Sequence, residues 1–177
     1  MFARTRRLTL RPRWPEDAAS LAAIEHSESV KPYTRAPSFI GEAEAAAAPS
    51  DGRRDVEFVI CTHEGGPPRL IGSIALVPQI DAHELCFWLT SDVWGRGYAT
   101  EAGNAVVAVA RHALPIRRLT AVCPSDHAAS VRVLRKLGFR GAERREFGPS
   151  AARDRTTERM IMELDVDDRR PSMPMAA

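Results

Sequence analysis

Residues 94–99 read Trp-Gly-Arg-Gly-Tyr-Ala and stand between an apolar strand-like segment and a long apolar helical segment. Glycine adopts backbone conformations that other residues avoid, so Gly95 and Gly97 allow a sharp turn that exposes backbone N–H groups. Because these groups lie at the start of a helix, where the helix dipole also favours negative charge, the stretch predicts a site for a phosphate-bearing cofactor. The alternative is a tight strand-to-helix turn that binds no ligand.

Charge and composition exclude several classes of function. The chain has 177 residues and a formal net charge of +2. No basic block is interleaved with aromatic residues, so we expect no nucleic-acid partner, and scattered arginine pairs such as Arg6-Arg7 are expected to be solvated. The N-terminal residues lack the apolar stretch of a secretion signal, and no run approaches the length of a membrane span. We therefore expect a cytoplasmic protein without membrane contact.

The cysteine pattern argues against both metal binding and disulfides. Cys61, Cys86 and Cys123 lie far apart, each in an apolar, strand-like segment. No pair has the spacing of a metal site, and an odd number argues against a disulfide framework. Free thiols and no bound metal are expected.

Periodicity and turn residues predict a mixed α/β (α+β) fold in one domain over residues 1–165, followed by a flexible tail over 166–177. A meander followed by strand–helix–strand units indicates a mixed, mostly antiparallel sheet of about seven strands, with about four helices on both faces. The expected strands are 8–12, 55–62, 69–78, 83–90, 117–123, 139–147 and 157–165. The expected helices begin at 14–17, 41, 98 and 127 and end near 26, 48, 114 and 137.

Three phosphate-binding motifs compete for the glycine turn. The nucleotide P-loop needs a Gly-Lys-Ser/Thr ending, which is absent here. The dinucleotide fingerprint needs a small residue where Thr100 stands and an acid at the end of the strand 119–123, which has none. It also normally follows the first strand of its domain rather than a meander.

The third interpretation depends on two longer stretches. Residues 84–102 read Glu-Leu-Cys-Phe-Trp-Leu-Thr-Ser-Asp-Val-Trp-Gly-Arg-Gly-Tyr-Ala-Thr-Glu-Ala, and residues 127–139 read His-Ala-Ala-Ser-Val-Arg-Val-Leu-Arg-Lys-Leu-Gly-Phe. The first resembles the acetyl-CoA site of the Gcn5-related N-acetyltransferases (GNAT), most closely the ribosomal-protein-alanine acetyltransferase (RimJ/RimL-type) branch. The second resembles the Asn-x-x-Ser…Lys-Leu-Gly-Phe segment of the same family. The resemblance covers roughly residues 6–165.

The resemblance implies which residues hold the cofactor. Backbone amides at the start of the helix would cradle the CoA diphosphate, and the Arg96 side chain could add a cation. Trp94 stands where the family usually has Gln or Arg, as is common in this branch. His127 replaces the usual Asn; it either contacts the cofactor or is a solvated first-turn residue. The cradling residues are Gly95, Arg96, Gly97, Tyr98, Ala99 and Thr100.

In the family, two central parallel strands splay apart, and the pantetheine arm pairs with the free edge of the first. Here the strands would be 84–90 and 118–123, and the pairing would fall on the backbone of Trp88, Leu89 and Thr90. The Leu89 amide would polarise the thioester carbonyl and stabilise the oxyanion.

Two residues are candidates for proton transfer. Glu84 lies on the strand leading into the cofactor site, where the branch also has Glu, and could accept the proton of the amine; it could instead be a surface carboxylate or a salt-bridge partner. Ser130 matches a serine proposed to protonate departing CoA in this branch, because Leu134 occupies the place of the family's Tyr. Ser130 could instead cap or pack its helix. Covalent catalysis by Cys86 or Cys123 is a further possibility, but direct attack by the amine in a ternary complex is preferred.

The leading hypothesis is an N-acetyltransferase that moves the acetyl group of acetyl-CoA to a primary amine, either a protein N-terminus or a small molecule. The alternatives are a catalytically inactive acyl-CoA-binding sensor and a dinucleotide-binding oxidoreductase. Tyr33, in the loop between the first two helices, is a candidate substrate contact. Relatives are often dimers, so a homodimer is possible.

Overall fold

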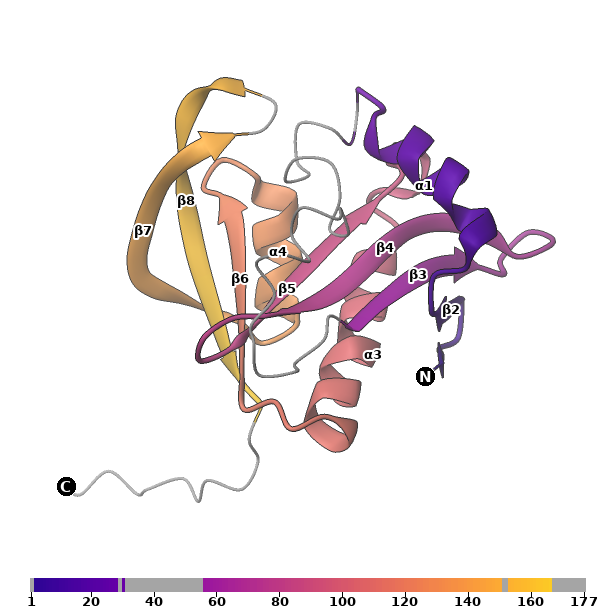
Figure 1. Ribbon diagram of the computed structural model, residues 1–177, viewed down its shortest axis with the longest axis horizontal. Coiled ribbons are helices and arrows are strands. Elements are labelled where there is room, and N and C mark those ends of the chain that lie inside the picture. The colour runs from indigo at the N-terminus through magenta and orange to yellow at the C-terminus, as the bar shows by residue number, and fades with distance from the viewer. Residues whose placement is uncertain (1, 29, 31–55, 151–152, 167–177) are drawn as a thin grey trace.

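The computed structural model describes residues 2–28, 30, 56–150 and 153–166, and these form one eight-stranded sheet with helices on both faces (Figure 1). The sheet order is β1-β2-β3-β4-β5-β6-β8-β7. In chain order the elements are β1 (Ala3–Arg4), β2 (Leu8–Arg11), the 3₁₀ turn η1 (Pro15–Asp17), α1 (Ala18–Glu25), β3 (Val56–Thr62), β4 (Arg69–Pro78), β5 (His83–Leu89), η2 (Ser91–Val93), α3 (Tyr98–Ala113), β6 (Arg118–Pro124), α4 (Ala128–Lys136), β7 (Arg140–Ser150) and β8 (Arg153–Asp165).

The predicted mixed, mostly antiparallel sheet is confirmed. Strands β1 to β5 pair in sequence order as an antiparallel meander, and the β6–β8–β7 pairs are also antiparallel. Among the described strands, only β5 and β6 run parallel, because α3 connects them as a crossover.

The strand count differs from the prediction because β1 has only two residues, too few for a periodic pattern to reveal. Strands β7 and β8 also extend further toward one another than expected, across residues 148–150 and 153–156. The described residues contain three α-helices; the helix predicted over 41–48 lies outside them.

Two apolar clusters lie on opposite faces of the sheet. The larger one packs the sheet against α3 and α4, and residues such as Phe58, Ile74 and Val106 are almost fully buried there. The two helices approach closely at Gly103, where a side chain would not fit. A Cβ at this position would lie 2.5 Å from a methyl carbon of Leu137, the residue that follows α4. The smaller cluster forms under α1 and consists of Leu21, Val30, Val59, Cys61 and Trp88. Alternate residues of the central strands therefore face two separate apolar layers.

The parallel pair at the centre of the sheet is short, and its strands diverge. Only His83 with Leu119 and Glu84 with Thr120 pair between β5 and β6. Yet β5 continues to Leu89 and β6 to Pro124, and Figure 1 shows the two strands moving apart. The predicted splaying is confirmed. Beyond Glu84, the edge of β5 that faces β6 has no strand partner among the described residues.

Candidate active site

The glycine turn leads from η2 into α3. Gly95 and Gly97 have φ values of +76° and +82°, a region that residues with a side chain rarely adopt. Gly97 is the N-cap of α3, and the first intrahelical hydrogen bond runs from the Glu101 N–H to the Gly97 carbonyl oxygen, at 3.0 Å. The amides of residues 98–100 therefore have no acceptor within the helix. Donors in this arrangement suit an anion, because the helix dipole adds to them.

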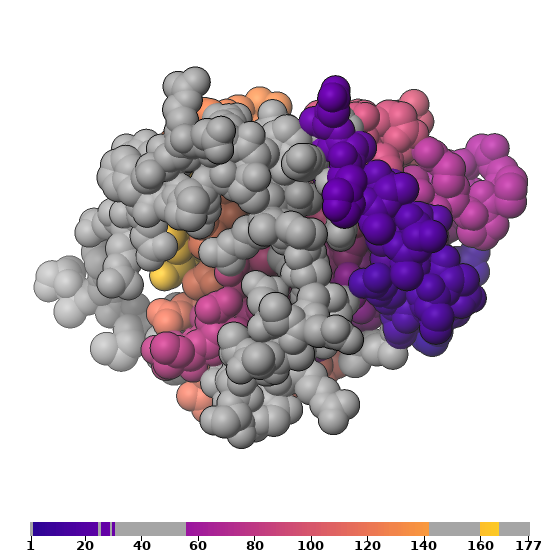
Figure 2. Space-filling model, turned by 45° about the horizontal axis from the view of Figure 1, so that its top comes forward, coloured from indigo at the N-terminus to yellow at the C-terminus, as the bar shows by residue number. Residues whose placement is uncertain are grey.

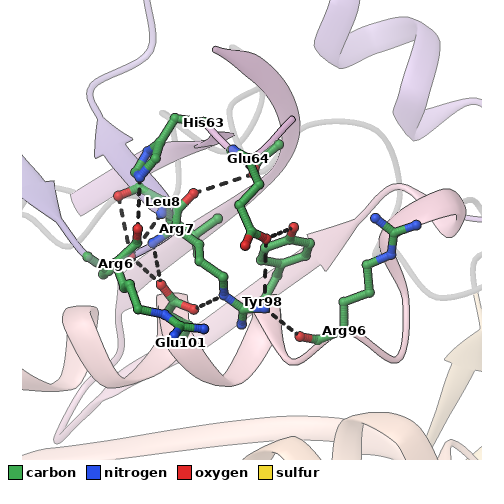
Figure 3. Close-up of polar contacts among 10 residues, drawn as sticks. Arg6, Arg7, Leu8, His63, Glu64, Arg96, Tyr98 and Glu101 are labelled. Atoms are coloured by element: carbon green, nitrogen blue, oxygen red, sulfur yellow. Dashed lines mark hydrogen bonds and ion pairs between the residues drawn. The ribbon is translucent and has the colours of Figure 1, made fainter. Parts of the chain in front are cut away.

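An arginine from the N-terminal segment, Arg7, contacts the backbone of this turn (Figure 3). The Arg7 Nη1 donates a hydrogen bond to the Arg96 carbonyl oxygen at 3.0 Å, and the Arg7 Nε lies 2.6 Å from Glu101 Oε2. The Arg7 side chain is 18% exposed, so the expectation that the Arg6-Arg7 pair is solvated is wrong for Arg7; Arg6 is exposed. The Arg96 guanidinium is exposed and projects away from Arg7.

Tyr98 and Glu64 complete this polar network. The Tyr98 hydroxyl donates to Glu64 Oε2 at 2.5 Å, and the Tyr98 ring lies 4.5 Å below the Arg7 guanidinium carbon. Glu64 belongs to the β3–β4 turn, which lies beside the N-terminal segment at one end of the molecule (Figure 2). Tyr98, expected to contribute an amide, thus has a side chain that is buried and hydrogen-bonded.

The register of β4 and β5 determines which backbone groups of β5 face the diverging strand. The Thr90 N–H donates to the Ile71 carbonyl oxygen at 2.8 Å, which places Trp88 and Thr90 in the hydrogen-bonded rows toward β4. Backbone groups alternate in direction along a strand, so those of Phe87 and Leu89 point toward β6. Of the three residues predicted to pair with pantetheine, Leu89 is the one directed to the open edge.

Trp94 fixes the end of that edge. Its indole Nε1 donates to the Leu89 carbonyl oxygen at 2.8 Å, although nearly half of the side chain is exposed. This hydrogen bond spans the short segment between β5 and the glycine turn. It therefore fixes the position of the Leu89 carbonyl relative to the turn.

Glu84 lies at the point where the two strands part. Its pairing with Thr120 is the last one of the parallel ladder, and only 5% of the residue is exposed. Gln79 Nε2 donates to Glu84 Oε2 at 3.4 Å. Period two places the side chain on the same sheet face as Trp88, opposite the face covered by α3 and α4. The interpretation of Glu84 as a surface carboxylate is therefore wrong.

His127 and Ser130 meet just beyond the end of β6. The Ser130 Oγ and the His127 Nδ1 are 2.7 Å apart, and the His127 N–H donates to the Pro124 carbonyl oxygen at 3.0 Å. Both residues are half-buried, so a contact with a ligand is sterically open to them. An imidazole and a hydroxyl at this distance share one proton, whose position depends on the tautomer of the imidazole.

The thiol of Cys123 is poorly suited to covalent catalysis. Burial raises the pKa of Cys123 to about 11, so almost none of it is thiolate at neutral pH. Cys86 is half-buried. Among the described residues no group of three or more His, Cys, Asp or Glu could hold a metal ion. No helix in the same residues is long and apolar enough to span a membrane. Tyr33 lies outside them.

Comparison with known proteins agrees with these features. The model of the acetyltransferase (GNAT) domain family matches residues 7–140, which include both the glycine turn and the His127–Ser130 segment. No curated protein is similar enough in sequence to count as a relative of the chain.

Solved structures share the fold at low sequence identity. An acetyltransferase of the GNAT family from Bacillus anthracis has a TM-score of 0.73 and 19% identity, over 94% of this chain and 99% of that one. A ribosomal-protein-S5-alanine acetyltransferase from Vibrio fischeri has a TM-score of 0.74 and 17% identity, over 97% and 100%. Mycobacterium smegmatis RimJ in complex with CoA-disulfide has a TM-score of 0.70 and 19% identity, over 89% and 81%.

Proposed function

The chain belongs to the acetyltransferase (GNAT) domain family and is an acyl-CoA-dependent acetyltransferase, and we propose that it moves the acetyl group of acetyl-CoA to a primary amine by direct attack in a ternary complex. The single observation that supports this most is the early end of the β5–β6 ladder beside a glycine turn at a helix N-terminus. One feature suits a thioester arm and the other suits its diphosphate.

The cofactor end of the proposed site consists of backbone donors. Amides from Gly95 to Thr100 hold the diphosphate, and the absence of side chains at Gly95 and Gly97 lets the phosphate oxygens approach. The exposed Arg96 guanidinium adds a cation beside them. Acetyl-CoA supplies an activated acetyl thioester. The similarity in fold to a RimJ that binds CoA-disulfide supports this placement.

The Leu89 amide stabilises negative charge on the acyl oxygen. Its N–H is directed to the open edge by the β4–β5 register, and Trp94 holds the carbonyl of the same residue. A donor that is already oriented needs no reorganisation when the charge develops, which is the main advantage of such a group.

Glu84 accepts the proton of the attacking amine, directly or through water. A terminal α-amine has a pKa near ~8 and a lysine amine near ~10.4, so a terminal amine needs less help from a base. A protein N-terminus is therefore the acceptor favoured here. Tyr33, in the loop that the sequence predicts to contact the acceptor, lies outside the described residues; its role stays a prediction, as does a homodimer.

Ser130 donates a proton to the leaving sulfur, with His127 as its proton source. When His127 is protonated, its Nδ1–H donates to the Ser130 oxygen, which leaves the Ser130 hydroxyl proton free to move to a thiolate. The histidine that replaces the family's Asn is thus given a chemical role.

A panel of amines tests the function. The pure protein is incubated with acetyl-CoA and peptides that begin with Ser, Ala or Thr, with polyamines and with aminoglycosides, while free thiol is measured. Thiol release that requires an amine supports the proposal. Thermal stabilisation by CoA without thiol release would favour the acyl-CoA sensor, and stabilisation by NAD but not by CoA would favour an oxidoreductase.

The role of Glu84 has its own test. Glu84→Gln is expected to lower kcat about a hundredfold, the usual size of general-base catalysis, with CoA affinity unchanged within about twofold. The matched control is Glu16→Gln, which removes the same charge from an exposed position on η1 and should leave kcat unchanged. If both variants turn over like the parent, Glu84 is not the base.

A further inference from the structure

A guanidinium from outside both sequence motifs lies directly behind the glycine turn. We propose that Arg7 is a positioning residue that fixes the Arg96–Gly97 peptide and thereby presents the amides that hold the CoA diphosphate. The inference rests on the proposed function for the identity of the ligand. It adds a residue that lies 89 positions before the turn in sequence.

Arg7 joins the turn and the first residues of α3 through one planar group (Figure 3). Its Nη1 donates to the Arg96 carbonyl oxygen at 3.0 Å, and its Nε lies 2.6 Å from Glu101 Oε2. The backbone N–H of Arg7 also donates to Glu101 Oε1, at 2.9 Å. The Tyr98 ring supports the guanidinium from one face. A planar guanidinium can make these contacts at the same time because its N–H donors have fixed directions, whereas a lysine ammonium is a compact point charge.

The contact with Arg96 determines where the next amide points. In a trans peptide the carbonyl and the following N–H point in opposite directions, and this chain has no cis peptide bond among the described residues. The Arg96 carbonyl is turned toward Arg7, so the Gly97 N–H is turned away from Arg7. Glycine resists peptide rotation less than other residues, so the two glycines alone do not fix this orientation.

Arg7 also neutralises a charge that would oppose phosphate binding. Glu101 lies in the first turn of α3, close to the amides that would hold the diphosphate. Burial alone would raise the pKa of Glu101, but hydrogen bonds from Thr5 and Arg7 lower it below its usual range, so the carboxylate is ionised. Without Arg7 this negative charge would face an anionic ligand with no partner of comparable strength.

The decisive experiment compares two acetyl donors. S-acetyl-pantetheine has the same thioester as acetyl-CoA but no diphosphate. The kcat/KM for acetyl-CoA divided by the kcat/KM for S-acetyl-pantetheine therefore isolates the diphosphate contacts. Arg7→Gln is expected to lower this ratio on the order of tenfold, mainly through the KM for acetyl-CoA, the effect of losing charge-assisted hydrogen bonds at one loop. CoA affinity, measured by calorimetry without any acceptor amine, should fall by the same factor.

Arg6→Gln is the matched control, because it removes the same charge from the adjacent, exposed residue. It should leave both measurements within about twofold of the parent, since screened surface charges contribute little. Arg7→Lys retains the charge without the fork and should stay at least about threefold weaker than the parent in CoA binding. It also serves if Arg7→Gln does not fold.

The possible outcomes separate this inference from the proposed function. If the parent binds no CoA, the proposed function is wrong. If the parent binds CoA and folded Arg7 variants bind it equally well, the inference is wrong. An equal loss with both donors would also overturn it, because that result indicates a general structural role.

Discussion

Two arginines near the N-terminus make the same kinds of contact in two different regions. In the Arg7 cluster, defined as Arg7, Tyr98 and Glu101, the guanidinium pairs with a carboxylate and lies 4.5 Å from an aromatic ring. In the Arg11 cluster, defined as Arg11, Trp14 and Asp17, the guanidinium binds both carboxylate oxygens, at 2.5 and 2.8 Å, and lies 3.9 Å from the indole. The interactions are alike, so their consequences depend on what each cluster connects.

The Arg11 cluster is local and the Arg7 cluster is not. Arg11 and Asp17 are six residues apart, and the Asp17 carboxylate also accepts the Trp14 N–H at the start of η1. Arg7 and Glu101 are 94 residues apart, and their contact joins the N-terminal segment to the glycine turn. The comparison teaches that one chemical pairing can begin a helix in one place and shape a ligand-binding loop in another.

The largest effect is expected where the Arg7 cluster meets the turn. Gly97→Val should weaken CoA binding about a hundredfold, because a branched residue resists a φ of +82° and crowds the phosphate. Its Cβ would also lie 3.5 Å from Arg7 Nη2. Calorimetric titration with CoA measures the loss.

The control for this substitution is Gly66→Val in the β3–β4 turn. Gly66 also has a positive φ, of +148°, and a Cβ there meets nothing within 4 Å. Gly66→Val should cost stability but leave CoA affinity within about twofold of the parent. Equal loss of CoA binding in both variants would contradict a specific role for the turn.

The second prediction separates the two clusters directly. Arg11→Gln should lower the free energy of unfolding by about 2 kcal/mol, because the buried Asp17 carboxylate loses the guanidinium that binds both of its oxygens. CoA affinity should stay within about twofold, unlike in Arg7→Gln. Urea unfolding and CoA titration provide the measurements, and the exposed Arg4→Gln is the control. A loss of CoA binding as large as that of Arg7→Gln would remove the functional difference between the clusters.

The third prediction concerns acid. The hydrogen bond from Arg11 lowers the pKa of Asp17, and the pKa of Glu101 is also below its usual value despite its burial. A carboxyl group with a lowered pKa stabilises the fold above its unfolded-state pKa, and this contribution is lost as the pH falls through its folded-state pKa. The free energy of unfolding should therefore decrease below about pH 4, the ordinary range of carboxyl groups.

Substitution of each carboxylate identifies its share of this acid dependence. Asp17→Asn and Glu101→Gln should each make the decrease shallower, as measured by urea unfolding between neutral pH and pH 3. An unchanged slope in both variants would show that neither cluster contributes to acid stability.

The smallest effect is expected at the hydroxyl of Tyr98. Tyr98→Phe retains the ring beside Arg7 and removes only the hydrogen bond to the half-exposed Glu64. CoA affinity should fall less than about threefold, because a hydrogen bond near water contributes little net free energy. A tenfold loss in the same titration would show that the hydroxyl, rather than the guanidinium, organises the turn.

Much of the fold was predictable because its signals are local. The meander, the two long helices and the glycine turn follow from apolar periodicity and from glycine's backbone freedom, which a short stretch of sequence contains. The two-residue β1 and the outer part of the β7–β8 hairpin, residues 148–150 and 153–156, were not predicted, because such short segments have no clear periodicity. For the site, the motifs predicted the turn and the candidates Glu84, His127 and Ser130, whereas no role was predicted from the sequence for Arg7, Glu64 or Glu101.

The sequence by itself determined that a glycine turn starts a helix after a meander, and that a second motif follows about 30 residues later. Only the tertiary structure decided that Arg7, rather than its neighbour Arg6, lies behind the turn. It also decided that the β5–β6 ladder ends at Glu84, and that Leu89 rather than Trp88 or Thr90 faces the open edge. The physical reason is the separation along the chain over which each interaction acts. Backbone preferences act over a few residues, whereas strand register and the partner of a charged side chain depend on segments brought together by the packing of the whole sheet.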